Sequence, residues 1–427
     1  MRITKPVEGK TVRGLAILAL MAIASTSAFG QGGTIPTTIR GDEATIARGI
    51  LDGNLIETNF RNHGELARWS DIPWGVWPRG IGGRHIDGVG IIVAGRVPAD
   101  RSSFPDVYGG LPDTTVTPMI LTYRDFGKRT GPNGELWGWL PLPGFNNPNR
   151  LDPITRDRTP TPALSDDPTS WPGSWPDRQD NPDDPGWPGT WNGFFGKGVF
   201  NADLESYYVM DDLSDQEYAI DPLTKRPNSQ YGVFYPNAAD SSMGGVGTQT
   251  RVRIFQWANV LAEDLMFILY RISNVAGWDH DELYFAQIQD YGLGEEEGDE
   301  NASFNPQEDV VFGWDQDGIG TRASGGEYTL GYTGFAFLES PARDSDGLDN
   351  DEDGITDESR FSGPGTRIEG QAGIQSATAG YDPVNFERVN GPLEDRPAFK
   401  AGVWWTGDEN LDWVGFSDEN GNGVWEN

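Results

Sequence analysis

The chain of 427 residues has no cysteine. Disulfide bonds, thiol catalysis, zinc–thiolate sites and a lipid anchor on a cysteine are therefore excluded. Histidine is rare as well, because His63, His85 and His280 are the only ones, and none stands in the His-Glu-x-x-His arrangement of zinc hydrolases. Since disulfides cannot stiffen the loops, bound metal is the obvious substitute, because an ion that binds only the folded state stabilises it.

The common catalytic motifs are also missing. There is no Gly-x-Ser-x-Gly nucleophile elbow. Residues 193–198 (GFFGKG) lack the spacing and final Ser or Thr of a phosphate-binding loop, and residues 244–250 (GGVGTQT) run into a predicted strand rather than a helix. Among 65 acidic residues, carboxylate pairs of the glycosidase type arise by chance. Only a separation of about 5 or 6.5–9.5 Å inside a cleft would identify one.

Basic residues are few, 32 against 65 acids, which gives a formal charge of −33. Such a chain repels nucleic acid and anionic lipid head groups and attracts cations, so we expect no nucleic-acid partner. Only six of the basic residues are lysines. An acidic, lysine-poor surface is similar to that of salt-adapted proteins, so part of the charge can reflect the environment rather than the function.

Residues 1–30 have the pattern of a secretory signal peptide. A basic start precedes the apolar run 14–24, and Ala28 and Gly30 occupy the −3 and −1 positions of a cleavage before Gln31. The alternative, a membrane anchor, requires a longer run, and no other stretch is long and apolar enough to span a bilayer. Removing this segment, whose net charge is +3, takes the chain from −33 to −36. We expect a secreted or cell-surface protein without a membrane span in the mature chain.

The remaining composition predicts a mainly β fold of antiparallel β-sandwich domains with long loops rich in Pro, Gly, Trp and Asp. The chain has 57 Gly and 30 Pro, which favour turns, and 11% aromatic residues, which favour strands. One helical turn is predicted after Asp42, with Ala44, Ile46 and Ile50 on one face. Alternation predicts a half-buried strand at 250–260, and apolar residues on both faces predict a central strand at 263–274.

Composition also divides the chain into segments. Behind the signal peptide at 1–30 we predict an N-terminal β-rich domain (31–145), a Pro/Trp/Asp-rich extended loop (146–195), a β-sandwich domain (196–340), an acidic calcium-loop segment (341–363) and a C-terminal β segment (364–427). The loop contains three Trp-Pro pairs. Because indoles are costly to leave in water, we expect them to pin this loop to the protein.

The strongest chemical motif lies at residues 344–358 (DSDGLDNDEDGITDE). Acids alternate along it, a glycine permits a sharp bend, a backbone carbonyl follows, and another acid stands at the ninth position. In order, these are Asp349, Asp351, Asp353, Gly354, Ile355 and Asp357. Calcium takes six to eight oxygens on such an arc, whereas magnesium demands octahedral geometry. We predict a Ca²⁺ site. The alternative, a solvated acidic turn, leaves the carboxylates to repel one another.

This motif resembles the loops of thrombospondin type 3 calcium repeats over about fifteen residues. An EF-hand would close with glutamate at the twelfth position, which here is Arg360. The preceding Asp344 and Asp346 would add ligands for a second ion.

The last residues resemble EF-hand and dockerin calcium loops through Asp418, Asn420, Asn422, Gly423, Val424 and Glu426. The twelfth position would lie beyond Asn427, so we expect either a fragment or a weak site closed by Glu426 and the terminal carboxylate. Three further acidic fragments, at 211–215, 294–300 and 315–318, are interpreted as turns or solvated loops.

Over most of its length the chain resembles a group of large, functionally uncharacterised exported bacterial surface proteins with acidic calcium-type loops. The resemblance rests on segments such as TNFRNHGELARW (58–69) and VRIFQWANVLAEDLMFILYRISN (252–274), and on the ending DENGNGVWEN. It implies a location at the cell surface rather than an activity.

Two functions follow as hypotheses. The first is a secreted, calcium-stabilised structural or adhesive protein of the cell surface, without catalytic activity, that contacts surface polysaccharide or other surface proteins. The alternative is a carbohydrate-binding module or glycoside hydrolase, which needs exposed tryptophans beside a carboxylate pair. The candidate tryptophans are Trp137, Trp139, Trp171, Trp175, Trp187, Trp191, Trp404 and Trp405. If these indoles are buried, the alternative loses its platform.

Overall fold

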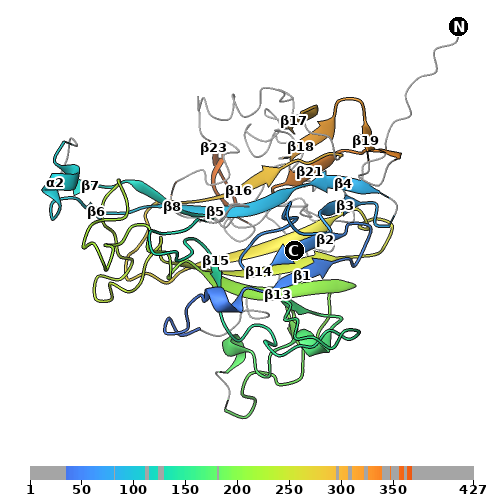
Figure 1. Ribbon diagram of the computed structural model, residues 1–427, viewed down its shortest axis with the longest axis horizontal. Helices are drawn as coiled ribbons and strands as arrows, with labels where there is room; N and C mark the ends of the chain where they lie inside the picture. Colours follow the sequence, from blue (N-terminus) through green and yellow to red (C-terminus); the bar gives the residue numbers. More distant parts are fainter. Residues whose placement is uncertain are drawn as a thin grey trace, which may run out of the picture. The chain divides into compact units, whose positions relative to one another are not determined.

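The computed structural model describes the greater part of the chain up to residue 367 (Figure 1). The described residues are 35–80, 82–110, 115–123, 129–179, 182–294, 298–305, 310–321, 326–338, 347, 355–359 and 363–367. The fold is mainly β, and the strand pairings with a defined register are antiparallel, which confirms the predicted fold class.

Among the described residues, the helical elements are short. They are η2 (Glu43–Thr45), α2 (Pro105–Tyr108), η3 (Pro168–Ser170) and η4 (Pro176–Arg178). Asp42 caps η2 by accepting a hydrogen bond from the Ala44 amide, as predicted, but the chain then turns into a strand. Ile50 therefore belongs to β1 and is 38% exposed, so the predicted helical face was wrong.

The strands up to residue 211 are β1 (Arg48–Leu51), β2 (Thr58–Arg61), β3 (Gly75–Trp77), β4 (Gly83–Ile86), β5 (Gly88–Arg96), β6 (Ala99–Asp100), β7 (Thr115–Val116), β8 (Met119–Tyr123), β9 (Leu140–Pro141), β10 (Ala163–Leu164), β11 (Asn192–Gly193), β12 (Gly196–Lys197) and β13 (Leu204–Asp211). The later strands are β14 (Thr248–Gln256), β15 (Met266–Asn274), β16 (Leu283–Asp290), β17 (Glu300–Asn305), β18 (Val310–Asp315), β19 (Ile319–Thr321), β20 (Glu327–Thr329), β21 (Thr333–Ala336), β22 (Ile355–Ser359) and β23 (Gly363–Arg367).

The chain divides into two compact units. The larger unit comprises residues 28–300 and 317–331, and the smaller unit comprises 301–316 and 332 onward, together with the N-terminal residues 1–27. In the smaller unit, β17, β18 and β21 form a three-stranded sheet, and β22 pairs with β23.

The larger unit is built on two sheets. One has the order β10-β13-β14-β15, with β9 also pairing to β13, and the other has the order β16-β5-β8. All eight residues of β13 are buried, and β14 is buried except at Arg251. The sheets contact each other through Tyr270 of β15 and Phe285 of β16, whose ring centroids lie 5.2 Å apart. Buried faces on both sheets thus form the sandwich core.

Two strand predictions need correction. The strand at 250–260 was expected to be half-buried, but β14 is buried on both faces, and the loop segment 146–195 contacts one of them through Phe194 against Phe255 and Asn192 against Arg253. The strand at 263–274 was expected to be central, yet within the described part of the chain β15 pairs only with β14. It is an edge strand, with residues of intermediate or high exposure.

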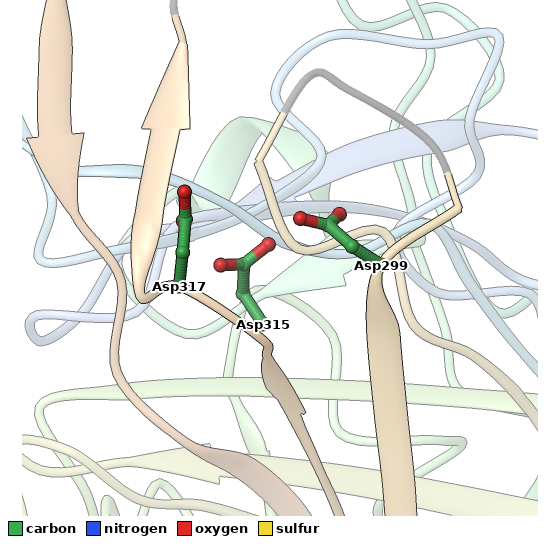
Figure 2. Close-up of side chains that lie close together, drawn as sticks. All are labelled: Asp299, Asp315 and Asp317. Atoms are coloured by element: carbon green, nitrogen blue, oxygen red, sulfur yellow. The ribbon is translucent and has the colours of Figure 1, made fainter.

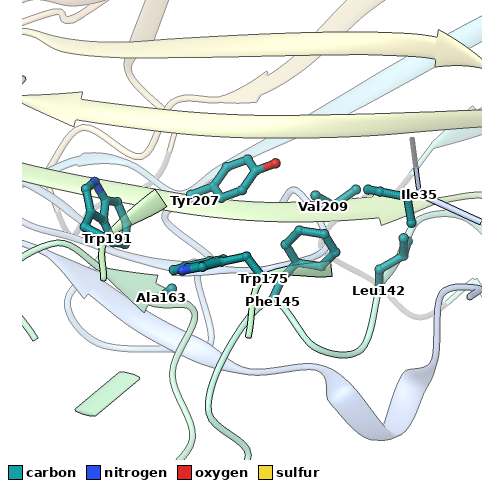
Figure 3. Packing of buried hydrophobic residues seen from close by; sticks show 8 residues of the cluster. All are labelled: Ile35, Leu142, Phe145, Ala163, Trp175, Trp191, Tyr207 and Val209. Carbon is teal, nitrogen blue, oxygen red and sulfur yellow. The ribbon is translucent and has the colours of Figure 1, made fainter. Parts of the chain in front are cut away.

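The Pro/Trp/Asp-rich segment is anchored by its indoles, as predicted (Figure 3). Trp175 and Trp191 are completely buried beside Tyr207 and Val209 of β13. The ring centroids of Trp175 and Trp191 are 5.7 Å apart in an edge-on arrangement, and Trp175 Nε1 donates to the Thr190 carbonyl at 2.8 Å. Each indole is therefore packed and hydrogen-bonded, as buried tryptophans require.

Candidate metal site

Three carboxylates meet where β17 begins and β18 ends (Figure 2). Asp299 directly precedes β17, Asp315 is the last residue of β18, and Asp317 follows two residues later. One oxygen from each lies within 4.8 Å of the other two. Asp315 is buried, Asp299 is half-buried and Asp317 is exposed, so the group opens to solvent on one side only.

Local structure explains this meeting. β17 and β18 are neighbours in one sheet, so the residue before the first and the residue at the end of the second come to the same edge. After Asp315 the chain turns sharply, with Gly318 at a φ of +73°, a conformation that favours glycine. The Asp317 carboxylate accepts a hydrogen bond from the Ile319 amide at 2.9 Å, which fixes the turn leading into β19.

The donor set fits a hard divalent cation. Carboxylate oxygens are the ligands that Ca²⁺ prefers, and three of them leave room for backbone carbonyls and water in its shell of six to eight. Three like charges within 4.8 Å of one another would otherwise repel strongly. The arrangement can therefore bind a cation.

Most of the sequence-predicted ligands lie outside the described residues. These are Asp344, Asp346, Asp349, Asp351, Asp353, Asp418, Asn420, Asn422, Val424 and Glu426. Ile355 and Asp357 belong to β22, of which the backbone is described, and Ile355 pairs with Arg367 of β23. The internal and terminal calcium loops therefore stay predictions.

The described triad was missed by sequence reasoning. Residues 294–300 were interpreted as a solvated loop and residues 315–318 as a turn, each on its own. Residues 292–306 were placed in one turn-like cluster and no strand was predicted at β17, so the strand pairing that brings Asp299 to Asp315 was not foreseen.

The acidic fragment 211–215 forms a turn at the end of β13, as predicted, and its carboxylates are buried, which was not predicted. Asp212 accepts hydrogen bonds from the Val246 and Thr248 amides, at 2.8 and 2.7 Å, and from the Thr122 hydroxyl at 2.7 Å. Asp215 accepts from the Gly138 amide at 2.7 Å. These carboxylates accept hydrogen bonds from amides of the loops around β13, where no backbone carbonyl serves as the acceptor. Burial nevertheless raises the pKa of Asp211 to about 7 and that of Asp212 to about 6.

None of the candidate tryptophans that the structure describes is exposed. Trp139, Trp175 and Trp191 are completely buried, while Trp171 and Trp187 are partly buried against the same core cluster. Trp137 is half-buried, and Trp404 and Trp405 lie outside the described residues. The carbohydrate hypothesis thus loses its structural support among the indoles that the structure describes.

The histidines are dispersed in the sequence, and His85 has a structural role. His85 is buried, with Nδ1 2.9 Å from the Gly83 carbonyl and Nε2 accepting from the Gly331 amide at 3.2 Å. Burial lowers the pKa of His85, so the ring stays neutral and available for these two bonds.

No family model, curated protein or solved structure matches this chain. Across the described ranges, no helix has the length and apolar character needed to cross a bilayer.

Proposed function

We propose that this is an exported structural or adhesive protein of the cell surface, a β-sandwich whose loops are held by Ca²⁺, and that it has no catalytic activity. The observation that carries the proposal is the convergence of Asp299, Asp315 and Asp317 on one edge of a sheet. The N-terminal sequence pattern supports export, and release of a chain beginning at Gln31 tests it directly by mass spectrometry.

Calcium would constrain the loops of this protein, which is the role that disulfide bonds have in many other exported proteins. The chain has no cysteine and many loops, so a cation that joins the ends of β17 and β18 would constrain them. An ion present at a hundred times its dissociation constant stabilises the folded state by about 2.7 kcal/mol. That amount is a sizeable share of the stability of a typical domain.

The test is thermal unfolding in millimolar CaCl₂ and in excess chelator. We expect a rise in Tm with calcium, and a smaller rise in Asp315→Asn, which removes the buried charge while keeping the side-chain shape. Asp279→Asn, which changes an exposed acid away from the triad, is the matched control and should respond like the unmodified protein.

A third variant, Asp351→Asn, separates the triad from the predicted internal loop. If only this variant loses the calcium response, the ion lies in the internal loop and the triad is a turn. If saturating calcium shifts the Tm of none of these proteins, the calcium proposal is wrong.

A further inference from the structure

One edge of β15 pairs with no other strand in the part of the chain that the structure describes. β15 runs beside β14 in continuous antiparallel register through nine residues, from Met266 to Asn274 (Figure 1). The Val275 amide continues this ladder by donating to the Gly247 carbonyl at 2.9 Å. Because hydrogen-bonded and non-hydrogen-bonded pairs alternate, the even-numbered residues of β15 direct their amides and carbonyls away from β14. This outer edge therefore offers a row of donors and acceptors to a further strand.

The outer edge of β15 lacks the features that usually keep edge strands apart. Unpaired edge strands are typically short, bulged or charged, or contain proline. β15 contains no proline and no lysine, its register with β14 is unbroken, and Arg271 is its only charged residue. Neither β14 nor β15 contains an acid, although the chain has 65 of them. A basic partner would gain from acids at its binding site, whereas a second copy of this acidic chain needs a strip without them.

The outer face of β15 is apolar and already ordered. Tyr270 contacts β16 on the face between the sheets, so the odd-numbered residues Phe267 and Leu269 lie on the opposite face. Leu269 is 38% exposed. The Phe267 ring stands edge-on to Trp257 with 5.3 Å between centroids, and Trp257 stacks on Phe255 at 5.8 Å. These ring contacts fix Phe267 in place, so an incoming strand finds an apolar surface that needs little further ordering.

We infer that β15 pairs with β15 of a second copy of this chain, antiparallel about a two-fold axis at Leu269. Addition of a strand to a free sheet edge gains main-chain hydrogen bonds, and a two-fold axis makes one strand its own partner. The outward groups of Ile268 and Tyr270 then complete the ladder between the copies. In this register Arg271 of each copy lies opposite Phe267 of the other, so the one charge of the strand meets an aromatic ring rather than a second arginine.

The first test uses the absence of cysteine from the chain, because Leu269→Cys introduces its only thiol. Leu269 directs its own amide toward β14, so it forms a non-hydrogen-bonded pair with its symmetry mate. The Cα atoms of such a pair lie about 4.5 Å apart, within the range of a disulfide bond. We expect oxidation by diamide to convert most of this variant into a disulfide-linked dimer on a non-reducing gel. Leu151→Cys, at a leucine of similar exposure in the loop segment 146–195, is the matched control and should stay largely uncrosslinked.

The second test is sedimentation velocity over a dilution series, in chelator-containing buffer so that the result is independent of the calcium proposal. We expect the unmodified protein to form a dimer that dissociates on dilution. Leu269→Lys should weaken this association about tenfold or more, because two like charges meet at the axis and an apolar contact is lost. A mixture of Leu269→Lys and Leu269→Glu should restore the dimer, which could not happen if the variants had failed to fold. Leu151→Lys should dimerise like the unmodified protein.

Three outcomes would each overturn the inference. A protein that stays monomeric at every concentration would show that β15 does not pair with a second copy. A dimer that Leu269→Lys leaves intact would place the interface elsewhere on the molecule. Equal crosslinking of Leu269→Cys and Leu151→Cys would show that the disulfide reports random collision rather than the register of paired strands.

Discussion

The carboxylate of Asp211 is buried at the end of β13 with one oxygen bonded and the other not. Its Oδ1 accepts from the Gly41 amide at 2.9 Å, while Oδ2 has no hydrogen-bond partner among the described residues. Burial, which disfavours the charged carboxylate, and then the nearby charge of Asp212 raise the pKa of Asp211 to about 7. This residue therefore makes the fold sensitive to pH near neutrality.

The sign of that effect follows from linkage. The folded-state pKa of Asp211 lies above its unfolded value of 3.8, so the folded protein holds the proton that the unfolded chain releases. Stability is then greatest below about pH 4 for this group and is lost as pH rises toward 7. Between pH 5 and pH 8 the loss amounts to about 2–3 kcal/mol.

Asp211→Asn should remove this loss, because an amide imitates the neutral acid and keeps the oxygen that accepts from Gly41. We expect the variant to be the more stable of the two at both pH 5 and pH 8, and its advantage to be larger at pH 8 by about 2–3 kcal/mol. Asp279→Asn should change neither value. A variant that is less stable at pH 8 would show that Asp211 is ionised in the folded state.

At the scale of elements, the loop segment 146–195 acts as part of the core although it contains little regular structure. Trp175 has no exposed surface and packs against Trp191 and Tyr207. Trp175→Ala should therefore destabilise the protein by about 3–5 kcal/mol, the usual cost of removing a buried indole. Urea unfolding followed by circular dichroism measures this.

Trp69→Ala provides the comparison, because its indole is 57% exposed. It should cost much less than Trp175→Ala. Equal, small losses in both variants would mean that the segment is dispensable for folding, and its packing would then be a consequence of the fold rather than a cause.

The strands show which parts of this fold can be predicted from the sequence and which parts cannot. Strands such as β5, β14 and β15 were predictable because alternation and apolar runs report which faces are buried. The edge position of β15 was not, because an apolar face says nothing about how many hydrogen-bonded neighbours a strand has. Asp299 and Asp315 were missed for the same reason: their proximity depends on the pairing of β17 with β18, which no local pattern encodes.

At the scale of the whole molecule, the net charge of −33 must repel itself wherever it is not neutralised. Raising NaCl from about 0.01 to 1 M shortens the screening length from about 30 to about 3 Å, so Tm should rise steadily with salt.

A resident cation would behave differently, because carboxylates that converge on a partly buried point bind it by coordination rather than by screening. The addition of a few millimolar CaCl₂ in 1 M NaCl should therefore still raise the Tm. MgCl₂ at the same concentration should raise it less, because three carboxylates on a turn suit the flexible shell of calcium better than a strict octahedron. If calcium adds nothing once NaCl has screened the surface, the acidic residues act only through their general repulsion, and the protein is an acidic scaffold without metal.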